Sequence, residues 1–338
     1  MTGSNASKII CPICGRTSDI QESRFENFLV CLLCGGHFAK KTEAPAYLED
    51  YFEEEGTSFI PPPKDHGYRP VDEWNSNLKG KEGHHGRKPM VGGFIYLAAR
   101  PLARLFLWMR LRKIFRLPKT IRILDYGAGD GKLVAYLRSH GLDAVGFDPS
   151  PAAVKVARNH GRPVYSRIDG PLFDLMMFWH SLEHAEWPLE VIAGAREHLG
   201  TGGRLLIAVP NAASWEARFF GSLWFHYDYP FHVVQFTPVS LSYMLEKNGF
   251  KITSWDFFSP EYTLSGLVQS FLNLFFPKNF LYSLFSQRRF GISRAYARLY
   301  LVPALPLIVI FLPFLVLFFF LELVCRRSGA MIVMAERQ

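Results

Sequence analysis

The chain has 338 residues, of which 49% are hydrophobic and 15% aromatic, and its formal net charge at pH 7 is +8. This length allows two or more domains with full cores, while the apolar content is high for a soluble enzyme. The first 14 residues lack the apolar core of a secretory signal, so we expect a cytoplasmic protein rather than a secreted one. A basic, aromatic-rich chain favours an anionic membrane surface or a nucleic acid as its partner.

Four of the five cysteines form two C-x-x-C pairs with 16 residues between them: Cys11, Cys14, Cys31 and Cys34. This spacing is typical of a structural zinc site with four thiolate ligands, in which no coordination position is left open for water. Two disulfide bonds are the alternative, which a reducing cytoplasm disfavours. Residues 1–42 are therefore predicted to form a zinc ribbon that is too small to fold without its metal.

Residues 43–118 are predicted to be a linker that ends in a basic amphipathic helix. Residues 60–89 hold three consecutive prolines and four glycines, which indicate irregular structure. In residues 92–117, apolar side chains recur every three or four positions with six basic residues between them. Such a helix can lie in an anionic bilayer interface. The alternative is a helix that caps the following domain and leaves its basic face in water.

Residues 121–133, IRILDYGAGDGKL, predict a buried strand, a glycine-rich loop and the start of a helix. Gly127, Gly129 and Gly131 let the backbone turn sharply and approach a ligand closely. A second strand follows and ends at Asp148, which lies 21 residues after Gly127, a distance that suits a carboxylate accepting hydrogen bonds from ribose hydroxyls. The glycines run G-x-G-x-G, whereas the dinucleotide fingerprint is G-x-G-x-x-G. An ordinary glycine turn is the alternative.

This order of acid, glycines and second acid resembles motif I of the class I methyltransferases that use S-adenosylmethionine (SAM). The resemblance implies that a short set of residues lines the cofactor pocket: Asp125, Gly127, Ala128, Gly129, Gly131, Asp148 and His180. It also makes Asp169, which follows the third strand, a candidate for contact with adenine. The ribbon followed by a SAM domain resembles a bacterial group that includes sugar C-methyltransferases.

The resemblance implies a Rossmann-like α/β fold with a seven-stranded sheet. Further strands are predicted at residues 163–166, 173–178, 204–209 and 251–258, with helices between them. The SAM domain is expected to span residues 119–260. Residues 330–338 are expected to return to it as an antiparallel last strand beside the strand at 251–258, so that residues 261–329 form an insertion.

His180, Glu183 and His184 stand at positions i, i+3 and i+4 after the strand at 173–178. On a helix their side chains would share one face near the carboxyl edge of the sheet, where ligands bind. Three roles stay open for them: orientation of the SAM pocket, general base catalysis, or binding of a divalent metal as in ubiquinone-type O-methyltransferases.

Residues 224–238, WFHYDYPFHVVQFTP, are dense in aromatic side chains. They resemble a D-x-P-x-H…F-(S/T)-P stretch of bacterial glycan and quinone-like methyltransferases, although Phe231 stands where that stretch often has Arg. Methyl transfer mainly requires alignment in a dry pocket, and a hydroxyl acceptor also needs a base. His232 is the first candidate for that base, and a purely structural His232 is the alternative.

The insertion at residues 261–329 carries two uncharged runs, residues 262–277 and residues 299–321. The second run is about 35 Å long as a helix, enough to span a bilayer. Because the last strand must rejoin the cytoplasmic sheet, the chain has to enter and leave the membrane on one side, and Pro303, Pro306 and Pro313 favour a broken or re-entrant hairpin. A buried helical pair at an oligomer interface is the alternative.

The sequence therefore predicts a SAM-dependent methyltransferase with structural zinc, held at the cytoplasmic face of the membrane. Its expected acceptor is a hydroxyl or carbon of a lipid-linked glycan, a sugar or an isoprenoid or quinone-like molecule; a homo-oligomer is compatible with the sequence. Methylation of RNA or protein, and a membrane scaffold that retains the SAM fold, are the alternatives. Nucleic acid is disfavoured because the strand at 173–178 is followed by WHSL instead of the N/D-P-P-Y/F pattern of base-amino methyltransferases.

Overall fold

The computed structural model describes residues 9–17, 20–40, 108–109, 111–283 and 294–338, and the statements below concern these residues. The predicted linker and most of the predicted basic helix lie outside them. The described end of that helix, residues 111–117, packs on the sheet: Leu111 and Ile114 are fully buried, and the side chains of Arg112 and Lys113 pair with Asp256 at 3.1 and 3.5 Å. This end therefore caps the domain, as the second of the two interpretations expects.

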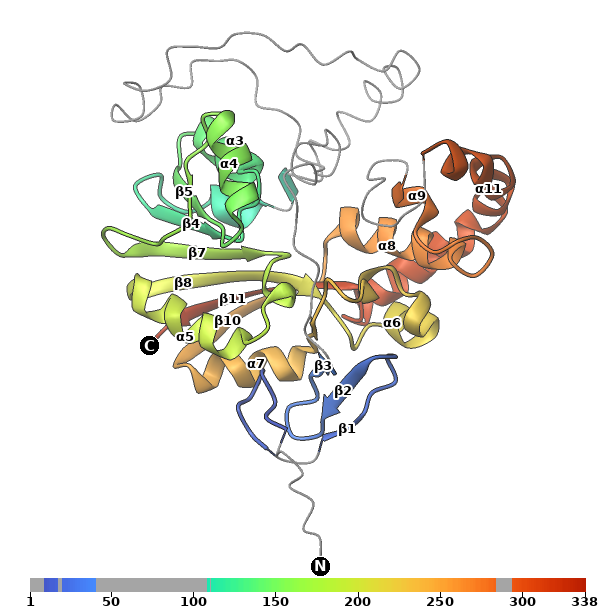
Figure 1. Cartoon of the computed structure of the whole chain (residues 1–338), viewed down its shortest axis with the longest axis horizontal. Helices are drawn as coiled ribbons and strands as arrows, with labels where there is room; N and C mark the ends of the chain where they lie inside the picture. The colour runs from blue at the N-terminus through green and yellow to red at the C-terminus, as the bar shows by residue number, and fades with distance from the viewer. Residues whose placement is uncertain (1–8, 18–19, 41–107, 110, 284–293) are drawn as a thin grey trace, which may run out of the picture.

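A seven-stranded sheet forms the centre of the molecule (Figure 1). Its strand order is β10-β11-β8-β7-β4-β5-β6. The strands are β4 (Arg122–Tyr126), β5 (Asp143–Phe147), β6 (Val164–Tyr165), β7 (Phe173–Trp179), β8 (Leu199–Pro210), β10 (Phe250–Asp256) and β11 (Ala330–Arg337). Strand β11 pairs antiparallel with both β8 and β10, which confirms the predicted place of the last strand.

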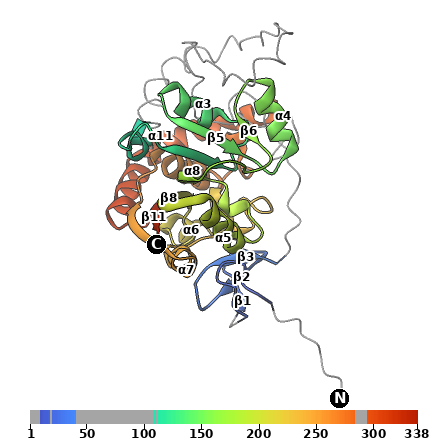
Figure 2. The ribbon, with the colours of Figure 1, turned by 90° about the vertical axis from the view of Figure 1, so that its left-hand side faces the viewer.

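Both faces of the sheet are covered, so its central strands read as continuous apolar runs. Along β7, Leu175 and Met177 pack into the core under α3 (Lys132–Ser139), whereas Met176 and Phe178 pack into the core under α5 (Pro188–His198) and α7 (Pro238–Lys247). Helix α4 (Pro151–Asn159) covers the edge at β6. Figure 2 shows α3 and α4 on one side of the sheet and α5 and α7 on the other.

The cysteine-rich N-terminus forms a second sheet together with a strand from the middle of the chain. Its order is β1 (Ile20–Glu22), β2 (Phe28–Cys31), β3 (His37–Ala39) and β9 (Val234–Gln235). The predicted ribbon is thus present, and it is continuous with the segment that carries His232. In Figure 2 the ribbon lies directly below α7.

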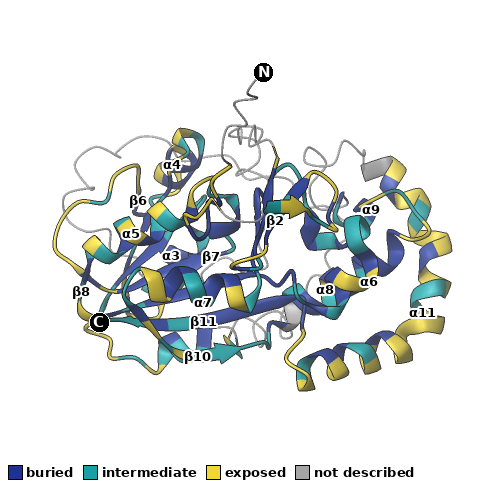
Figure 3. Cartoon of the chain, turned by 90° about the horizontal axis from the view of Figure 1, so that it is seen from below, coloured by how far each residue is buried: buried dark blue, intermediate teal, exposed yellow. Residues whose placement is uncertain are grey.

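The insertion between β10 and β11 is helical, and it consists of α8 (Pro260–Leu272), α9 (Phe280–Ser283) and α11 (Arg294–Val324) among the described residues. Helix α11 packs against α8 and α9. It continues through Pro303, Pro306 and Pro313 as one helix, so the chain is not interrupted there, although the helix axis turns sharply (Figure 3). Each proline removes one backbone hydrogen bond, yet the unbroken apolar sequence and the support from α8 and α9 keep the helix intact.

Most of the α11 surface is exposed. By length and composition alone, Tyr296–Val324 could cross a membrane, and only 17% of its most apolar stretch is buried. Figure 3 shows α11 at one end of the molecule with exposed residues along its length. Its C-terminal end returns to α6 (Trp215–Phe220), which leads through η2 (Gly221–Leu223) and η3 (Phe225–Tyr227) into the aromatic segment. The remaining short turn, η1 (Leu182–His184), follows β7.

Candidate active site and metal centre

The glycine loop connects β4 to α3 in the conformation that its sequence predicts. Gly127, Gly129 and Gly131 have φ angles of 78°, 56° and 74°, the left-handed region that favours glycine. The backbone N–H groups of Gly127 and Ala128 both donate to the carbonyl of Phe147, at 2.8 and 3.0 Å. The loop is therefore fixed to the end of β5 and leaves the start of α3 facing the space above the sheet.

Asp148 ties the same loop to the second strand. Its two carboxylate oxygens accept the backbone N–H groups of Gly129 and Ser150, each at 2.8 Å. Burial raises the pKa of Asp148, and these two hydrogen bonds oppose the rise. Asp125 is also buried, at the end of β4. The carboxylate predicted to bind ribose thus lies beside the loop, where its remaining lone pairs can accept hydroxyl donors.

Ser181 closes the other side of the loop. Its hydroxyl donates to the carbonyl of Tyr126 at 2.6 Å, and a Cβ atom on Gly127 would come within 2.5 Å of the Ser181 Cβ. Only glycine fits at position 127. This contact joins the cofactor loop to the segment that follows β7.

The sequence predicts a helix through His180, Glu183 and His184, and this prediction is wrong. Instead, His180 has a φ angle of 50°, η1 is a single 3-10 turn, and α5 begins later, at Pro188. The His180 ring stacks on Tyr262 of α8 with ring centroids 3.8 Å apart. The sequence itself disfavours a helix at these positions, because the residue before a proline avoids helical backbone angles and Trp187 precedes Pro188.

Glu183 is the centre of the cluster that forms in place of that helix. Its side chain is fully buried, and Oε1 lies 3.3 Å from Nδ1 of His180 and 4.0 Å from Nε2 of His232. A second carboxylate, Asp228, lies 3.7 Å from Nε2 of His232. The structure thus joins His180 to His232 through Glu183. His184 lies beside His232 with ring centroids 4.8 Å apart, so the predicted group of His180, Glu183 and His184 is brought together with His232.

Backbone carbonyls determine the tautomer of two of these histidines. Nδ1 of His232 lies 2.9 Å from the carbonyl of His226, and Nδ1 of His184 lies 2.9 Å from the carbonyl of Phe231. A carbonyl can only accept, so each Nδ1 carries the proton and each neutral ring has its lone pair on Nε2. His232 therefore presents a basic nitrogen beside two carboxylates that would stabilise its imidazolium form.

The neighbouring His226 has a different environment. Its Nε2 donates to the carbonyl of Tyr262 at 3.2 Å, and burial lowers its pKa to about 3, with a smaller effect of the His180 charge. His226 thus stays neutral and supports the segment around His232. The lining of this region by α8, Tyr262 in particular, had no signal in the sequence other than the apolar run.

Three members of this cluster could hold a divalent cation. Glu183, His184 and His232 each offer one ligand atom, all within 4.8 Å of one another. The 4.0 Å between Glu183 Oε1 and His232 Nε2 lies between the separations of about 3.0 and about 4.2 Å that adjacent and opposite ligands have around a six-coordinate ion.

The four cysteines fit a zinc ion closely. All four are buried, and the sulfur atoms of Cys11 and Cys34 lie 3.8 Å apart, those of Cys14 and Cys31 3.7 Å. Thiolates at about 2.3 Å from a tetrahedral zinc ion are about 3.8 Å apart, far from the S–S bond length of about 2.05 Å. The four cysteines thus form the predicted cluster, which could bind zinc, and they are free thiols, so the alternative of two disulfides is wrong.

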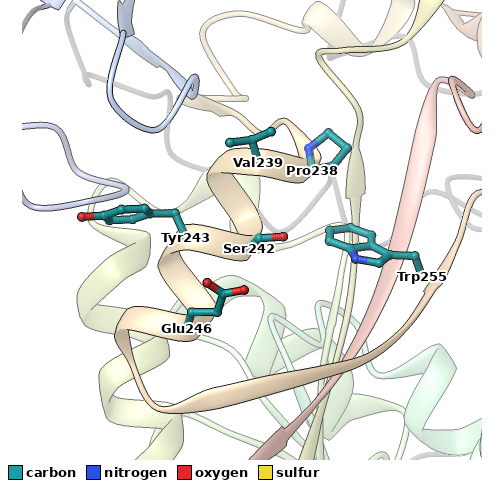
Figure 4. A pocket seen from close by; sticks show the side chains of 6 residues that line it. All are labelled: Pro238, Val239, Ser242, Tyr243, Glu246 and Trp255. Carbon is teal, nitrogen blue, oxygen red and sulfur yellow. The ribbon is translucent and has the colours of Figure 1, made fainter.

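Two further features lie away from this site. Asp169 is exposed on the loop between β6 and β7, where no helix intervenes, and its contact with adenine stays a prediction. A shallow groove of about 350 Å³ lies between α7 and β10 (Figure 4). Its lining residues are Pro238, Val239, Ser242, Tyr243, Glu246 and Trp255. None of them belongs to the glycine loop or to the Glu183 cluster, so the groove is separate from the candidate active site.

Known proteins resemble the chain in its central part. Residues 94–254 match the family described as "Methyltransferase domain". The ubiquinone biosynthesis O-methyltransferase of Cereibacter sphaeroides is 31% identical over 103 residues, which are 27% of this chain and 42% of that protein. The corresponding protein of Azorhizobium caulinodans is 30% identical over 105 residues, 28% of this chain and 42% of that protein. The match thus spans less than half the length of these relatives.

Solved structures resemble the chain more distantly. A SAM-dependent methyltransferase from Archaeoglobus fulgidus is 18% identical with a TM-score of 0.42, and the match covers 72% of this chain and all of that one. The magnesium protoporphyrin IX methyltransferase of Synechocystis PCC 6803, solved with bound SAH, is 19% identical with a TM-score of 0.36, over 51% of this chain and 82% of that one.

Proposed function

We propose that this chain, whose residues 94–254 carry a class I SAM-dependent methyltransferase domain, is a membrane-bound O-methyltransferase that acts on a ring hydroxyl of a quinone-like acceptor. The proposal rests on the environment of His232. Its Nδ1–H donates to the carbonyl of His226, while its Nε2 lies near the carboxylates of Glu183 and Asp228. The names of the related O-methyltransferases support the acceptor class.

SAM supplies the electrophilic methyl group when it is bound. On the protein side, Nε2 of His232 removes the hydroxyl proton of the acceptor as the acceptor oxygen forms its bond to the methyl carbon. Bound SAM would supply the methyl group and keep the electron pair of the carbon–sulfur bond as a neutral thioether, so the protein itself has to accept only the hydroxyl proton, at His232. Glu183 and Asp228 stabilise the imidazolium that His232 becomes, and the aromatic segment keeps water from the reacting atoms.

The cofactor half of the site has a different task. Asp148 would hold the ribose. The loop, which is fixed by bonds to Phe147, Asp148 and Tyr126, would present its glycine backbone to the cofactor. This arrangement orients the cofactor without any change of charge in the protein.

Helix α11 supports attachment to a membrane surface. Nine of its apolar side chains are more than half exposed: Leu299, Val302, Leu305, Val309, Ile310, Phe314, Leu317, Phe320 and Val324. Both ends of the helix return to the same globular body, since α11 packs on α9 and Trp215 donates to the carbonyl of Arg327 at 3.1 Å. We therefore place α11 along one bilayer face rather than across the bilayer.

A cluster of arginines at the C-terminal end of α11 favours an anionic lipid surface. Arg24 and Arg327 donate to the neighbouring carbonyls of Ala212 and Ala213, and Arg218 lies near enough to Arg24 for their charges to interact. These side chains are exposed, as is that of Arg326. Like charges gathered at the end of an apolar helix match the phosphates of a bilayer, with about 1 kcal/mol for each basic residue.

Methyl transfer to membrane extracts tests this function. The purified full chain is incubated with labelled SAM and with membranes that contain hydroxylated quinone precursors, and the label is followed into lipid, glycan, protein and RNA. We expect label in the quinone-like lipid fraction, with alkali-stable ether bonds. Label in RNA or protein, or none in any fraction with SAM bound, would contradict the proposal.

A catalytic metal at Glu183, His184 and His232 is the second candidate, because each histidine donates its Nδ1–H to a carbonyl as metal-bound histidines do. Excess Mg²⁺ or Zn²⁺ after mild chelation, which leaves the four-cysteine site loaded, distinguishes the two. The base mechanism predicts unchanged turnover, whereas a catalytic metal predicts that turnover is lost on chelation and returns with the ion.

A further inference from the structure

The zinc ribbon is physically joined to the segment that carries His232. Strand β3 pairs with β9, with His37 opposite Gln235 and Phe38 opposite Val234. Beyond the ladder, the Ala39 N–H donates to the carbonyl of Val233 at 2.8 Å. His232 thus lies two residues before β9, the strand that pairs with the ribbon.

Val233 and Gln235, which follow His232, also fix its position. The Val233 N–H donates to the carbonyl of Glu183 at 3.0 Å, so the carboxylate partner and the base are held by one backbone bond. The buried Gln235 side chain donates to the carbonyls of Tyr227 and His226, at 3.0 and 3.3 Å. The His226 carbonyl is also the acceptor that orients His232. Gln235 therefore holds the group that sets the tautomer of the base.

Ribbon side chains also support the aromatic segment. The Phe25 ring stacks on Trp224 with ring centroids 6.1 Å apart, and Phe28 contacts Tyr227 and Tyr229 at 5.7 and 5.9 Å. The Tyr227 hydroxyl donates to the carbonyl of Glu26. These residues lie between the two cysteine pairs, so the metal determines their arrangement.

Both cysteine pairs are attached to the catalytic domain. Lys247 donates to the carbonyl of Cys14 at 2.6 Å, and Thr237 donates to the carbonyl of Gly35 at 3.4 Å. The Leu189 N–H donates to the carbonyl of Pro12 at 3.3 Å. The cofactor loop is held in another way, through Asp148, Phe147 and Ser181.

We propose that zinc binding by the four cysteines positions His232 and the wall of the acceptor site, while binding of SAM does not depend on the metal. This inference rests on the proposed function of His232 as the base. Gln235 is then a positioning residue, because it acts through the His226 carbonyl and does not touch the reacting atoms.

The first test uses the zinc-loaded full chain with Gln235→Leu, and Glu22→Gln as the control on the exposed edge of the ribbon. Zinc content and the SAM dissociation constant should stay within twofold of wild type in both variants. For Gln235→Leu only, kcat/KM for the acceptor should fall at least tenfold, and the acidic limb of its pH profile, on which His232 becomes protonated, should move. An unchanged pH profile with wild-type kcat/KM would overturn the inference.

The second test removes zinc from the full chain with a strong chelator and follows backbone hydrogen exchange. Exchange should accelerate in residues 224–238 and stay slow in residues 122–148, with SAM still bound. Equal acceleration in both regions would show that zinc supports the whole fold and would overturn the inference. His232→Ala separates the proposed catalytic role of His232 from the proposed role of zinc. Full activity in that variant would refute His232 as the base, whereas the exchange experiment would still measure how zinc affects residues 224–238.

Discussion

The two sides of the sheet's carboxyl edge are built in different ways. The cofactor side consists of β4, β5 and the glycine loop, which lie within 27 consecutive residues from Arg122 to Asp148. The acceptor side draws on four segments far apart in the chain: the ribbon, η1, residues 224–238 and α8. Local sequence is enough to form the first, whereas the second depends on a metal, a buried carboxylate and a helical insertion. The cofactor side should therefore tolerate changes that destroy the acceptor side.

The largest expected effect on turnover comes from replacing His232, the proposed base. His232→Ala should lower kcat by about 10²–10⁴-fold, the usual contribution of general base catalysis. Its SAM dissociation constant should stay within twofold, because the glycine loop is fixed through Phe147, Asp148 and Ser181, whereas His232 is fixed through the carbonyl of His226. His198→Ala is the matched control, since its Nδ1 also bonds a backbone carbonyl, that of Gly194, but it lies at the end of α5. Equal losses in the two variants would remove His232 from the mechanism.

The converse change acts on the cofactor side. Gly127→Ala should weaken SAM binding at least tenfold, because a Cβ at position 127 meets Ser181 and the φ angle of 78° is unfavourable for alanine by about 1–2 kcal/mol. Calorimetric titration with SAM measures the change. Gly161→Ala has a similar φ angle of 64° with no atom near its Cβ, so it should show the backbone cost without the loss of affinity. A Gly127→Ala protein with wild-type affinity would contradict the location of the cofactor.

A smaller effect is expected at the membrane. Phe314→Glu on the exposed face of α11 should weaken binding to vesicles with anionic lipid by about tenfold or more, since it removes about 1.5–3 kcal/mol of apolar transfer. Arg327→Ala should weaken it several-fold, and only at low salt. Arg204→Ala, at an exposed ion pair with Glu336 on the far strands, is the control. Vesicle cosedimentation measures the binding. If all three variants bind vesicles as wild type does, α11 does not bind the membrane surface.

The smallest effect concerns the connection between α11 and the acceptor side. Glu216 and Glu322 are both fully buried; Oε1 of Glu322 accepts the Glu216 N–H at 2.8 Å, and Trp224 donates to Glu216 at 3.3 Å. Burial, followed by the charge of Glu322, raises the pKa of Glu216 well above its usual 4.5. The folded chain then binds more protons than the unfolded one above pH 4.5, so the free energy of unfolding falls as pH rises from there.

Glu216→Gln should flatten that fall, by about 1.4 kcal/mol for each unit of pKa shift that it removes. Denaturant titrations of wild type and variant from pH 4.5 to 8, in the same detergent, measure the difference. The variant should gain most relative to wild type at the alkaline end. Parallel curves for the two proteins would show that Glu216 does not titrate in this range.

The cofactor side and the order of the sheet could be predicted from the sequence, because each depends on local patterns. The glycine spacing determines the loop, and apolar runs bounded by Asp125, Asp148 and Pro210 determine the strands. Strand β8 was still predicted too short, since Gly200-Thr201-Gly202-Gly203 indicated a turn, whereas β8 begins at Leu199, which pairs with Phe173.

The acceptor side could be predicted only in part. His232 was identified from its surroundings in sequence, but its partner Glu183 lies 49 residues earlier, and its attachment to Ala39 is a contact between distant segments. The end of the basic helix was interpreted as a membrane surface because the pairing of Arg112 with Asp256 has no local signal. Likewise, nothing near Glu322 indicates that it is buried against Glu216, and the three prolines gave no sign that α11 would stay continuous.

The separation of the two sides is the central claim, and calorimetric titration of His232→Ala with SAM tests it most directly. The variant should bind SAM with the wild-type dissociation constant, within twofold, while it transfers no measurable methyl group to the acceptor. A dissociation constant that rises in proportion to the loss of turnover would show that His232 belongs to the cofactor pocket, and it would contradict the division of the site.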